Sequence, residues 1–471
     1  MKQRVFTMQD QLAFATVSGD HNLLHVDPVA ARRLMFGGPI VHGIHLLLWA
    51  LDAWLEEAET PVALTSLTAN FRRPLGVGQE VQHRPSEDRD AQVKIDLFDA
   101  DGPLAKISFA WIARGSDWPK SPQLNSPLHG ECRPRTTDNL RGAVGMLPLE
   151  LDIEKASHLL PHVARLLPRL QIALLASTSR LVGMECPGLH STYAALSLRF
   201  EPTKAAEWLR FEVTNFDERF GRVMMTVACP GMEGTIKAYL RPAPTEQPRC
   251  DALRPLVDAD EFVGQRALVV GGSRGLGEVV AKLLALGGAD VRLSYCRGRQ
   301  EAEAVASEIL SHGGRAVAFP YDVLAPHDTL TRACETWKPT HLYYFATPFI
   351  AAGSKQAFSA DRFQKLSAYY VTGFAELIQR TRAISADLRY VFYPSTVYID
   401  ELPETMAEYI LAKCAGETLC DFLQQHFRGL VFYKPRLPRM GTDQTASFVA
   451  LENAETVTTM LSHLRIMGRQ S

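Results

Sequence analysis

Three groups capable of proton transfer and charge stabilisation lie near the amino end of the sequence. Asp20 and His25 are separated by four residues, and Gly43 stands just before an apolar run that predicts a helix. A carboxyl and an imidazole can divide acid and base work, and a free N–H at a helix start can stabilise an oxyanion. Elimination of a 3-hydroxyl from an acyl thioester needs all three groups. We therefore predict Asp20, His25 and the Gly43 N–H as catalytic groups of a dehydration.

A glycine-rich turn lies in the last third of the chain, between an apolar strand-like run and a predicted helix. Glycines in this position let the backbone approach a pyrophosphate, which the N–H groups of the helix start then bind. The next predicted strand ends without an acidic residue, whereas Arg274 and Arg297 suit the 2′-phosphate of NADPH better than the free ribose of NADH. The cofactor-binding residues predicted here are Gly271, Ser273, Arg274, Gly275, Leu276, Gly277 and Arg297.

A tyrosine and a lysine with helical spacing follow further along the chain. Among the 13 tyrosines, only Tyr409 has a lysine four residues later, Lys413. Reduction of a ketone by hydride needs a proton on the carbonyl oxygen, and a neighbouring ammonium makes a phenol a usable acid. On a helix, this spacing places both side chains on one face.

The amino-terminal residues resemble the MaoC-like (R)-specific enoyl hydratases. Asp20, Asn22 and His25 match the family's motif, although Leu23-Leu24 stands where the family usually has Pro-Leu, and His42-Gly43 matches its helix start. The resemblance implies acyl thioesters of an acyl carrier protein or coenzyme A as substrates. We expect His42 and His45 to be packing residues.

The stretch 263–445 resembles the short-chain dehydrogenase/reductase family. The resemblance implies that Tyr409 is the acid and Lys413 its partner, which also contacts the cofactor, and that Thr396 or the adjacent Ser395 polarises the carbonyl. It also implies that Asp322 and Val323 contact the adenine. The sequence departs from the family at residues 345–348, where Phe-Ala-Thr-Pro replaces Asn-Asn-Ala-Gly, and at Tyr370, which replaces an asparagine.

The pattern of predicted elements divides the chain into three parts, 1–118, 140–241 and 260–471, joined by two proline-rich segments, 119–135 and 241–255. The first two parts each contain one apolar helix followed by four alternating strands, an order typical of a double hot-dog fold. We expect the second of these halves to be non-catalytic. The third part alternates short apolar strands with helices, which predicts a doubly wound parallel sheet of Rossmann type. The expected strands of the three parts are 63–71, 81–84, 92–97 and 105–112, then 192–200, 209–215, 221–229 and 234–240, and finally 266–270, 290–295, 315–320, 341–345, 389–393 and 429–433. The expected helices of the first two parts are 44–55 and 166–181.

Composition excludes several classes of protein. Of 471 residues, 46% are hydrophobic and 22% charged, as in globular proteins, and a net charge of −2 gives no general attraction for nucleic acid. The eight cysteines have no metal-binding spacing, so we predict no metal and reduced thiols. We find no signal peptide and no membrane span, and predict a cytoplasmic protein. Both resembled families commonly associate, so a homo-oligomer is possible.

The two sites act on successive stages of one substrate class. We predict a bifunctional enzyme that reduces a 3-ketoacyl thioester with NADPH and dehydrates the product, in fatty-acid-like or polyketide biosynthesis. Two alternatives remain open. One is the reverse chemistry in degradation, by enoyl hydration and alcohol oxidation. The other is an active dehydratase whose nucleotide-binding part is a non-catalytic scaffold.

Overall fold

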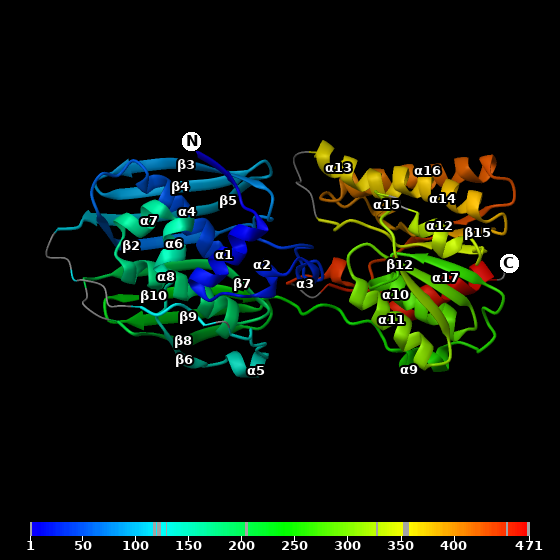
Figure 1. Ribbon diagram of the computed structural model, residues 1–471, viewed down its shortest axis with the longest axis horizontal. Helices are drawn as coiled ribbons and strands as arrows, with labels where there is room; N and C mark the ends of the chain where they lie inside the picture. Colours follow the sequence, from blue (N-terminus) through cyan, green and yellow to red (C-terminus); the bar gives the residue numbers. More distant parts are fainter. Residues whose placement is uncertain are drawn as a thin grey trace. The chain divides into compact units, whose positions relative to one another are not determined.

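The computed structural model describes residues 2–115, 119, 124–128, 130–202, 206–325, 328–351, 358–448 and 451–468 (Figure 1). The chain forms two compact units. The first comprises Met1–Ala243 with Ser447–Ala450, and the second comprises Pro244–Ala446 with Leu451–Ser471. Each unit has its own hydrophobic core, so the two are described separately.

The amino-terminal unit is built on one antiparallel sheet of ten strands. Their order across the sheet is β1-β3-β4-β5-β2-β7-β10-β9-β8-β6. The strands are β1 (Lys2–Val5), β2 (Val62–Phe71), β3 (Glu80–Arg89), β4 (Gln92–Asp99), β5 (Gly102–Ala113), β6 (Val144–Pro148), β7 (Ser191–Phe200), β8 (Trp208–Asp217), β9 (Arg222–Cys229) and β10 (Met232–Leu240).

The strand order reveals two equivalent halves. Reading outward from the centre, β2-β5-β4-β3-β1 corresponds to β7-β10-β9-β8-β6, and the halves meet where β2 and β7 pair, with Leu67 opposite Leu198. Each half therefore repeats the same strand connections. The predicted double hot-dog fold is confirmed.

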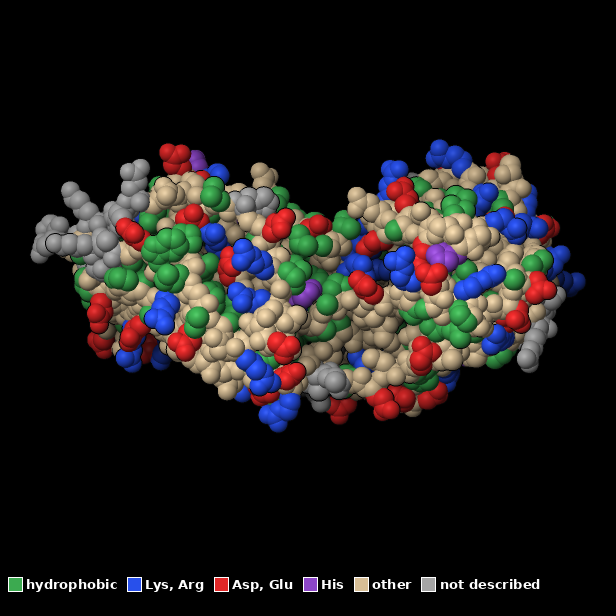
Figure 2. Space-filling model, turned by 90° about the horizontal axis from the view of Figure 1, so that it is seen from below, with side chains coloured by type: hydrophobic (Ala, Val, Ile, Leu, Met, Phe, Trp, Pro, Cys, Tyr) green, Lys and Arg blue, Asp and Glu red, His purple; other side chains and the backbone are tan. Residues whose placement is uncertain are grey.

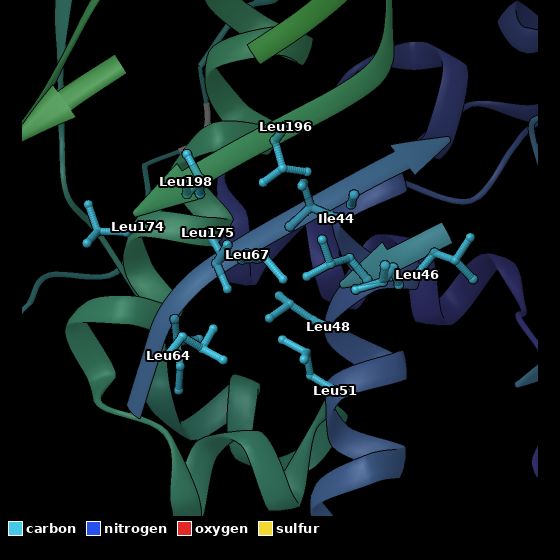
Figure 3. Close-up of a cluster of buried hydrophobic side chains, with 14 of the residues drawn as sticks. Ile44, Leu46, Leu48, Leu51, Leu64, Leu67, Leu174, Leu175, Leu196 and Leu198 are labelled. Carbon is cyan, nitrogen blue, oxygen red and sulfur yellow. The ribbon is translucent and has the colours of Figure 1, made fainter. Parts of the chain in front are cut away.

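One long helix from each half covers the same face of the sheet. The helix α4 (Gly43–Leu55) packs against α8 (Arg169–Arg180), and leucines of both helices meet leucines of β2 and β7 in one core (Figure 3). Gln171 of α8 also joins the halves, because its amide accepts from the Leu64 N–H at 2.9 Å and donates to the Leu64 carbonyl at 2.8 Å. The second helix was expected from residue 166, but Pro168 precedes it and it begins at Arg169. Shorter helices of this unit are α1 (Met8–Ser18), α2 (Leu23–Val26), α3 (Pro28–Ala31), α5 (Thr137–Leu140), α6 (Ile153–Leu159) and α7 (Pro161–Leu166), and a π-helical turn, η1 (Leu181–Glu185), follows α8.

The carboxy-terminal unit contains a parallel six-stranded sheet in the order β13-β12-β11-β14-β15-β17. In chain order this is 3-2-1-4-5-6, the arrangement of dinucleotide-binding folds. The strands are β11 (Arg266–Val270), β12 (Asp290–Tyr295), β13 (Arg315–Pro320), β14 (His341–Tyr344), β15 (Tyr390–Phe392) and β17 (Val431–Tyr433), and a two-stranded sheet pairs β16 (Ser395–Thr396) with β18 (Arg436–Leu437).

Helices cover both faces of the parallel sheet (Figure 1). Alternate residues of β11 enter different cores, Ala267 and Val269 on one side and Leu268 and Val270 on the other, because successive side chains of a strand point to opposite faces. The predicted Rossmann-type fold is confirmed. The helices are α9 (Cys250–Leu253), η2 (Arg254–Leu256), α10 (Gly275–Leu286), α11 (Arg299–Ser311), α12 (Thr329–Cys334), α13 (Ala360–Ser367), η3 (Ala368–Gly373), α14 (Phe374–Ile384), α15 (Tyr398–Glu401), α16 (Ala407–His426), η4 (Asp443–Thr445) and α17 (Thr456–Gly468).

The two segments expected as linkers contain ordered structure. Arg241 is only 2% exposed and α9 forms within 241–255, whereas Pro134 of the first segment bridges to Gly188. Residues 116–118, 120–123 and 129 of the first boundary region lie outside the described residues. Among the described helices, none has the length and apolar character needed to cross a membrane. On the face drawn in Figure 2, acidic and basic side chains are interspersed, as the small net charge leads us to expect.

Candidate active sites

A left-handed turn at the end of α1 buries Asp20 and Asn22. Gly19 ends the helix with φ +74°, a conformation that favours glycine, and the chain then reverses into the protein. Asn22 begins α2, accepting a hydrogen bond from the Leu24 N–H at 3.0 Å, and this short helix carries His25. The capped turn therefore fixes Asp20 and His25 relative to each other.

The Asp20 carboxyl is buried against the second half of the unit. Its Oδ2 accepts a hydrogen bond from the Ser179 hydroxyl at 2.7 Å, and its Oδ1 lies 3.3 Å from the Asn22 N–H. The His42 Nε2 lies 4.0 Å from Oδ2, but burial keeps this imidazole neutral, so it does not compensate the charge of the carboxylate. Burial raises the pKa of Asp20 to about 7. Near neutral pH this carboxyl is thus available as a proton donor.

The His25 ring is held in one tautomer. Its Nδ1 lies 2.8 Å from the Ile40 carbonyl oxygen, which can only accept, so we assign the proton to Nδ1 and a lone pair to Nε2. Burial lowers the pKa of His25 to about 4, and the ring stacks on His42 with 3.9 Å between centroids. His25 is therefore a neutral imidazole with an unprotonated Nε2.

The helix α4 begins at Gly43, one residue before the apolar run 44–55 that was expected to be helical. The first N–H groups of a helix have no acceptor within the helix, and in the described structure no other group accepts from the Gly43 N–H. Glycine leaves room there, since a Cβ at Gly43 would lie 3.3 Å from the Phe71 ring. The N–H at this helix start is free to bind an oxyanion.

Asp20, His25 and His42 lie together, with potential ligand atoms within 4.8 Å of one another. Both His42 nitrogens already lie at hydrogen-bond distance from protein groups, Nδ1 from the Gln11 side chain at 2.9 Å and Nε2 from the Asp20 carbonyl oxygen at 3.0 Å. Since Nδ1 of His25 is also occupied, the cluster suits proton transfer better than metal binding. His42 and His45 are fully buried, the latter stacked on Phe14.

The second half supplies two contacts that sequence reasoning missed. Ser179 of α8 donates to Asp20, and Gly183 of η1 packs so closely that a Cβ there would lie 2.1 Å from Oδ1 of Asp20. The amide of Asn22 donates to the Gly183 carbonyl at 2.8 Å, which ties the two halves together beside the carboxyl. The unusual run from Gly183 to Gly188 was the available signal, but its role depends on tertiary contacts.

The glycine turn between β11 and α10 fits a bound dinucleotide. Gly271 has φ +83°, and its Cβ would lie 2.8 Å from the Phe345 carbonyl carbon. A Cβ at Gly277 would lie 2.2 Å from the Gly271 carbonyl oxygen, so both positions require glycine. Gly275 begins α10 and Ser273 is buried in the turn, which leaves N–H groups of the helix start for a pyrophosphate.

The charged residues around this turn do not all remain free for a cofactor. Arg274 pairs with Asp443 at 3.2 Å, whereas Arg297 is exposed at the end of β12 beside Cys296. Asp322 accepts from the Leu324 N–H at 2.9 Å and adjoins Cys296, and Val323 is buried. Arg297 is therefore the better placed of the two arginines for a 2′-phosphate, and Leu276 follows the turn on α10.

Tyr409 and Lys413 lie in the first two turns of α16, as their spacing predicts. The Thr396 side chain lies close enough to the Tyr409 hydroxyl to lower its pKa, whereas Ser395 donates to Glu417 at 2.5 Å. Of the two neighbouring hydroxyls, Thr396 is thus the one beside Tyr409. We expected the Lys413 ammonium to lower the pKa of the Tyr409 phenol. Instead, burial raises the pKa of Tyr409 and lowers that of Lys413 to about 7.

The chain thus contains two kinds of domain. One is a double hot-dog domain with the acid–base pair Asp20 and His25, and the other is a Rossmann-type domain whose helix α16 carries Tyr409 and Lys413. Family comparisons identify the two parts. The MaoC like domain matches residues 1–97, and the short chain dehydrogenase family matches residues 265–379. The chain belongs to the MaoC-like family through its amino-terminal part, and its carboxy-terminal part contains a segment that matches the short-chain dehydrogenase family.

Three curated relatives match separate parts of the chain. An (R)-specific enoyl-CoA hydratase of Aeromonas caviae is 31% identical, over 23% of this chain and 77% of its own length. A mitochondrial 3-hydroxyacyl-[acyl-carrier-protein] dehydratase of Arabidopsis thaliana is 38% identical, over 17% of this chain and 46% of its own. A 3-oxoacyl-[acyl-carrier-protein] reductase of Synechocystis sp. is 42% identical, over 13% of this chain and 25% of its own. Apart from the hydratase, the chain therefore spans half or less of the relatives named here.

Proposed function

We propose that the chain reduces a 3-ketoacyl thioester with NADPH and then dehydrates the 3-hydroxyacyl product to an enoyl thioester. One observation carries the proposal. A carboxyl with a raised pKa and an unprotonated imidazole nitrogen lie beside a helix start whose Gly43 N–H has no acceptor in the described structure. These are the acid, base and oxyanion donor of an elimination next to a carbonyl.

The dehydration uses each group in its resting protonation state. Nε2 of His25 removes the C2 proton, and the Gly43 N–H stabilises the negative charge that develops on the thioester oxygen. Protonated Asp20 donates its proton to the C3 hydroxyl, which leaves as water while the C2–C3 double bond forms. His25 then holds one proton and Asp20 has lost one, so a proton returned through solvent restores both groups.

The reduction uses the glycine turn and the start of α16. Bound NADPH supplies the hydride to the C3 carbonyl. Tyr409 donates the proton to the carbonyl oxygen, and Thr396 orients the phenol and the carbonyl. The N–H groups at the start of α10 would bind the pyrophosphate of the cofactor, Arg297 would bind its 2′-phosphate, and Asp322 and Val323 would contact its adenine.

The two reactions fit one substrate, because the hydroxyl made by the first is the group that the second removes. The names of the relatives support acyl chains on a carrier protein or coenzyme A. Arg297 suits the 2′-phosphate of NADPH, and use of NADPH rather than NADH favours reduction over oxidation, which supports a place in fatty-acid-like or polyketide chain growth.

Product analysis tests both activities in one sample. Acetoacetyl thioesters of carrier protein and of coenzyme A are incubated with NADPH or NADH, and the 3-hydroxyacyl and enoyl products are measured by mass spectrometry. We expect enoyl product from the wild type, 3-hydroxyacyl product alone from Asp20→Asn, and no reduction by Tyr409→Phe. A wild type that neither oxidises NADPH nor forms enoyl product from (R)-3-hydroxyacyl thioesters would contradict the proposal.

A further inference from the structure

The environment of Lys413 is unusual for a buried ammonium. The side chain is 4% exposed, and its one hydrogen bond in the described structure runs from Nζ to the Pro394 carbonyl at 2.6 Å. The nearest carboxylate on the same helix, Glu417, is already bound by Ser395 and by Arg436 at 2.8 Å. One neutral acceptor is little compensation for a charge removed from water.

Aromatic rings surround the ammonium instead. Its Nζ lies 3.9 Å from the ring centroid of Tyr370, 5.0 Å from that of Tyr393 and 5.9 Å from that of Tyr409. A cation within about 6 Å of a ring face is attracted by the ring's electron density, and more strongly when water is excluded. Tyr370 is the nearest of the three.

Further contacts hold the Tyr370 ring in place. Tyr370 lies in η3 and is 2% exposed, and its hydroxyl is 2.5 Å from the Thr347 hydroxyl in the segment after β14. Its backbone carbonyl accepts from the Tyr393 hydroxyl at 3.1 Å, and its ring meets the Tyr409 ring edge-on at 5.8 Å. The ring is therefore held in contact with both Lys413 and Tyr409.

We propose that Tyr370 is a positioning residue for the reduction: its ring face keeps Lys413 protonated and directed toward Tyr409, in place of a hydrogen-bonding partner. This inference rests on the proposed reductase function and assigns a role to a residue that departs from the family pattern. The side chains that face Lys413 are Tyr370 from η3, Tyr393 beyond β15, and Tyr409, Glu417 and Cys420 from α16. Removing the nearest ring should make the ammonium lose its proton at lower pH.

Two substitutions separate the ring from the hydroxyl. Tyr370→Phe keeps the ring face and removes the bond to Thr347, whereas Tyr370→Leu removes the ring. Lys413 is titrated in the cofactor-free full chain by NMR of ¹³Cε-labelled lysine, and its signal is assigned by its loss in Lys413→Met. We expect the Lys413 titration of Tyr370→Phe to match the wild type and that of Tyr370→Leu to fall by about 1 pH unit.

Activity provides the second measurement. The alkaline limb of the pH–rate profile for ketoreduction should move to lower pH by the same amount in Tyr370→Leu, because Lys413 then loses its proton at lower pH. Equal Lys413 titrations in wild type and Tyr370→Leu, or equal shifts in the Leu and Phe variants, would overturn the inference. If Tyr370→Leu does not fold, Tyr370→Met, which fills more of the space, replaces it under the same criteria. The Lys413 titration could shift in Tyr370→Leu although neither the wild type nor the variants oxidise NADPH. That outcome would support the Tyr370–Lys413 coupling and overturn the reductase function.

Discussion

At the scale of single residues, protonation states decide which reaction each side chain can perform. Asp20 is buried and His25 lies half-buried beside it, and desolvation moves their pKa values in opposite directions, to about 7 and about 4. Between these values both groups are neutral, one holding a proton and the other a lone pair. The pair is therefore ready for a concerted elimination without an initial proton exchange.

The first prediction concerns the pH dependence of dehydration. The kcat/KM for (R)-3-hydroxyacyl thioesters should rise through about pH 4 as His25 loses its proton and fall through about pH 7 as Asp20 loses its own. Ser179→Ala serves as the matched variant. Because the Ser179 hydrogen bond lowers the pKa of Asp20, its removal should move the alkaline limb to higher pH. An alkaline limb that is unchanged in this variant would contradict the role of Asp20.

The second prediction concerns stability. The pKa of Asp20 is about 7 in the folded chain, above its ordinary 3.8, so the folded state binds the proton more tightly. Protonation of Asp20 therefore stabilises the folded state fully below pH 4, and this contribution to the free energy of unfolding is lost as pH rises toward 7. The side chain introduced by Asp20→Asn does not titrate. The free energy of unfolding of this variant minus that of the wild type should therefore increase between pH 5 and 8, by a few kcal/mol at most. Denaturant titrations of both proteins at the two pH values measure this, and a constant difference would refute it.

The third prediction distinguishes two adjacent hydroxyls. Thr396 lies beside the Tyr409 hydroxyl and lowers its pKa, whereas Ser395 donates a hydrogen bond to Glu417. Thr396→Val should therefore lower kcat for ketoreduction about 10²-fold, as expected for loss of a positioned polar group. Ser395→Ala should have a much smaller effect. Steady-state kinetics with NADPH decide between them, and a larger loss in Ser395→Ala would reverse the assignment.

At the scale of elements, the π-helical turn η1 of the second half completes the dehydration site. The acid Asp20 and the base His25 of this site come from the first half. Gly183 leaves the space that the Asp20 carboxyl occupies, and Asn22 donates to the Gly183 carbonyl. The second half thus contributes shape and a hydrogen bond from Ser179 to the amino-terminal site.

The fourth prediction follows from this close approach. In Gly183→Ala the new methyl group would overlap Oδ1 of Asp20, which must move. A displacement of about 1 Å should reduce kcat/KM for dehydration about 10²-fold. Ketoreduction in the same protein is the internal reference, and Gly130→Ala, whose Cβ would meet nothing within 4 Å, is the matched control. Equal dehydration by both variants would show that the turn does not position the carboxyl.

At the scale of the whole molecule, the chain has two units with separate cores. The core of the amino-terminal unit and the two cores of the carboxy-terminal unit share no residues. Each unit is large enough to fold cooperatively around its own core.

The fifth prediction is that heat or denaturant unfolds the chain in two transitions. NADP⁺ at 100 times its dissociation constant should stabilise only the carboxy-terminal unit, by about 2.7 kcal/mol. For a unit of this size that is a rise in Tm of about 5–10 °C. Calorimetry with and without NADP⁺ measures both transitions. A single transition, or equal shifts of two, would show that the units unfold together.

The architecture could be predicted from the sequence, because the periodicity of apolar residues records which face of each element is buried. The helix over 44–55, the paired sets of strands and the parallel strands of the last part all followed from that pattern. It also indicated Asp20, His25, Gly43, Tyr409 and Lys413, since their spacing within short local segments carries the chemistry. Contacts between distant segments could not be predicted, because they depend on how the chain folds in three dimensions. Ser179 and Gly183 meet Asp20, Thr396 rather than Ser395 meets Tyr409, and Tyr370 covers Lys413. Such pairs have no common spacing in the chain, and the pKa values depend on burial that only packing creates.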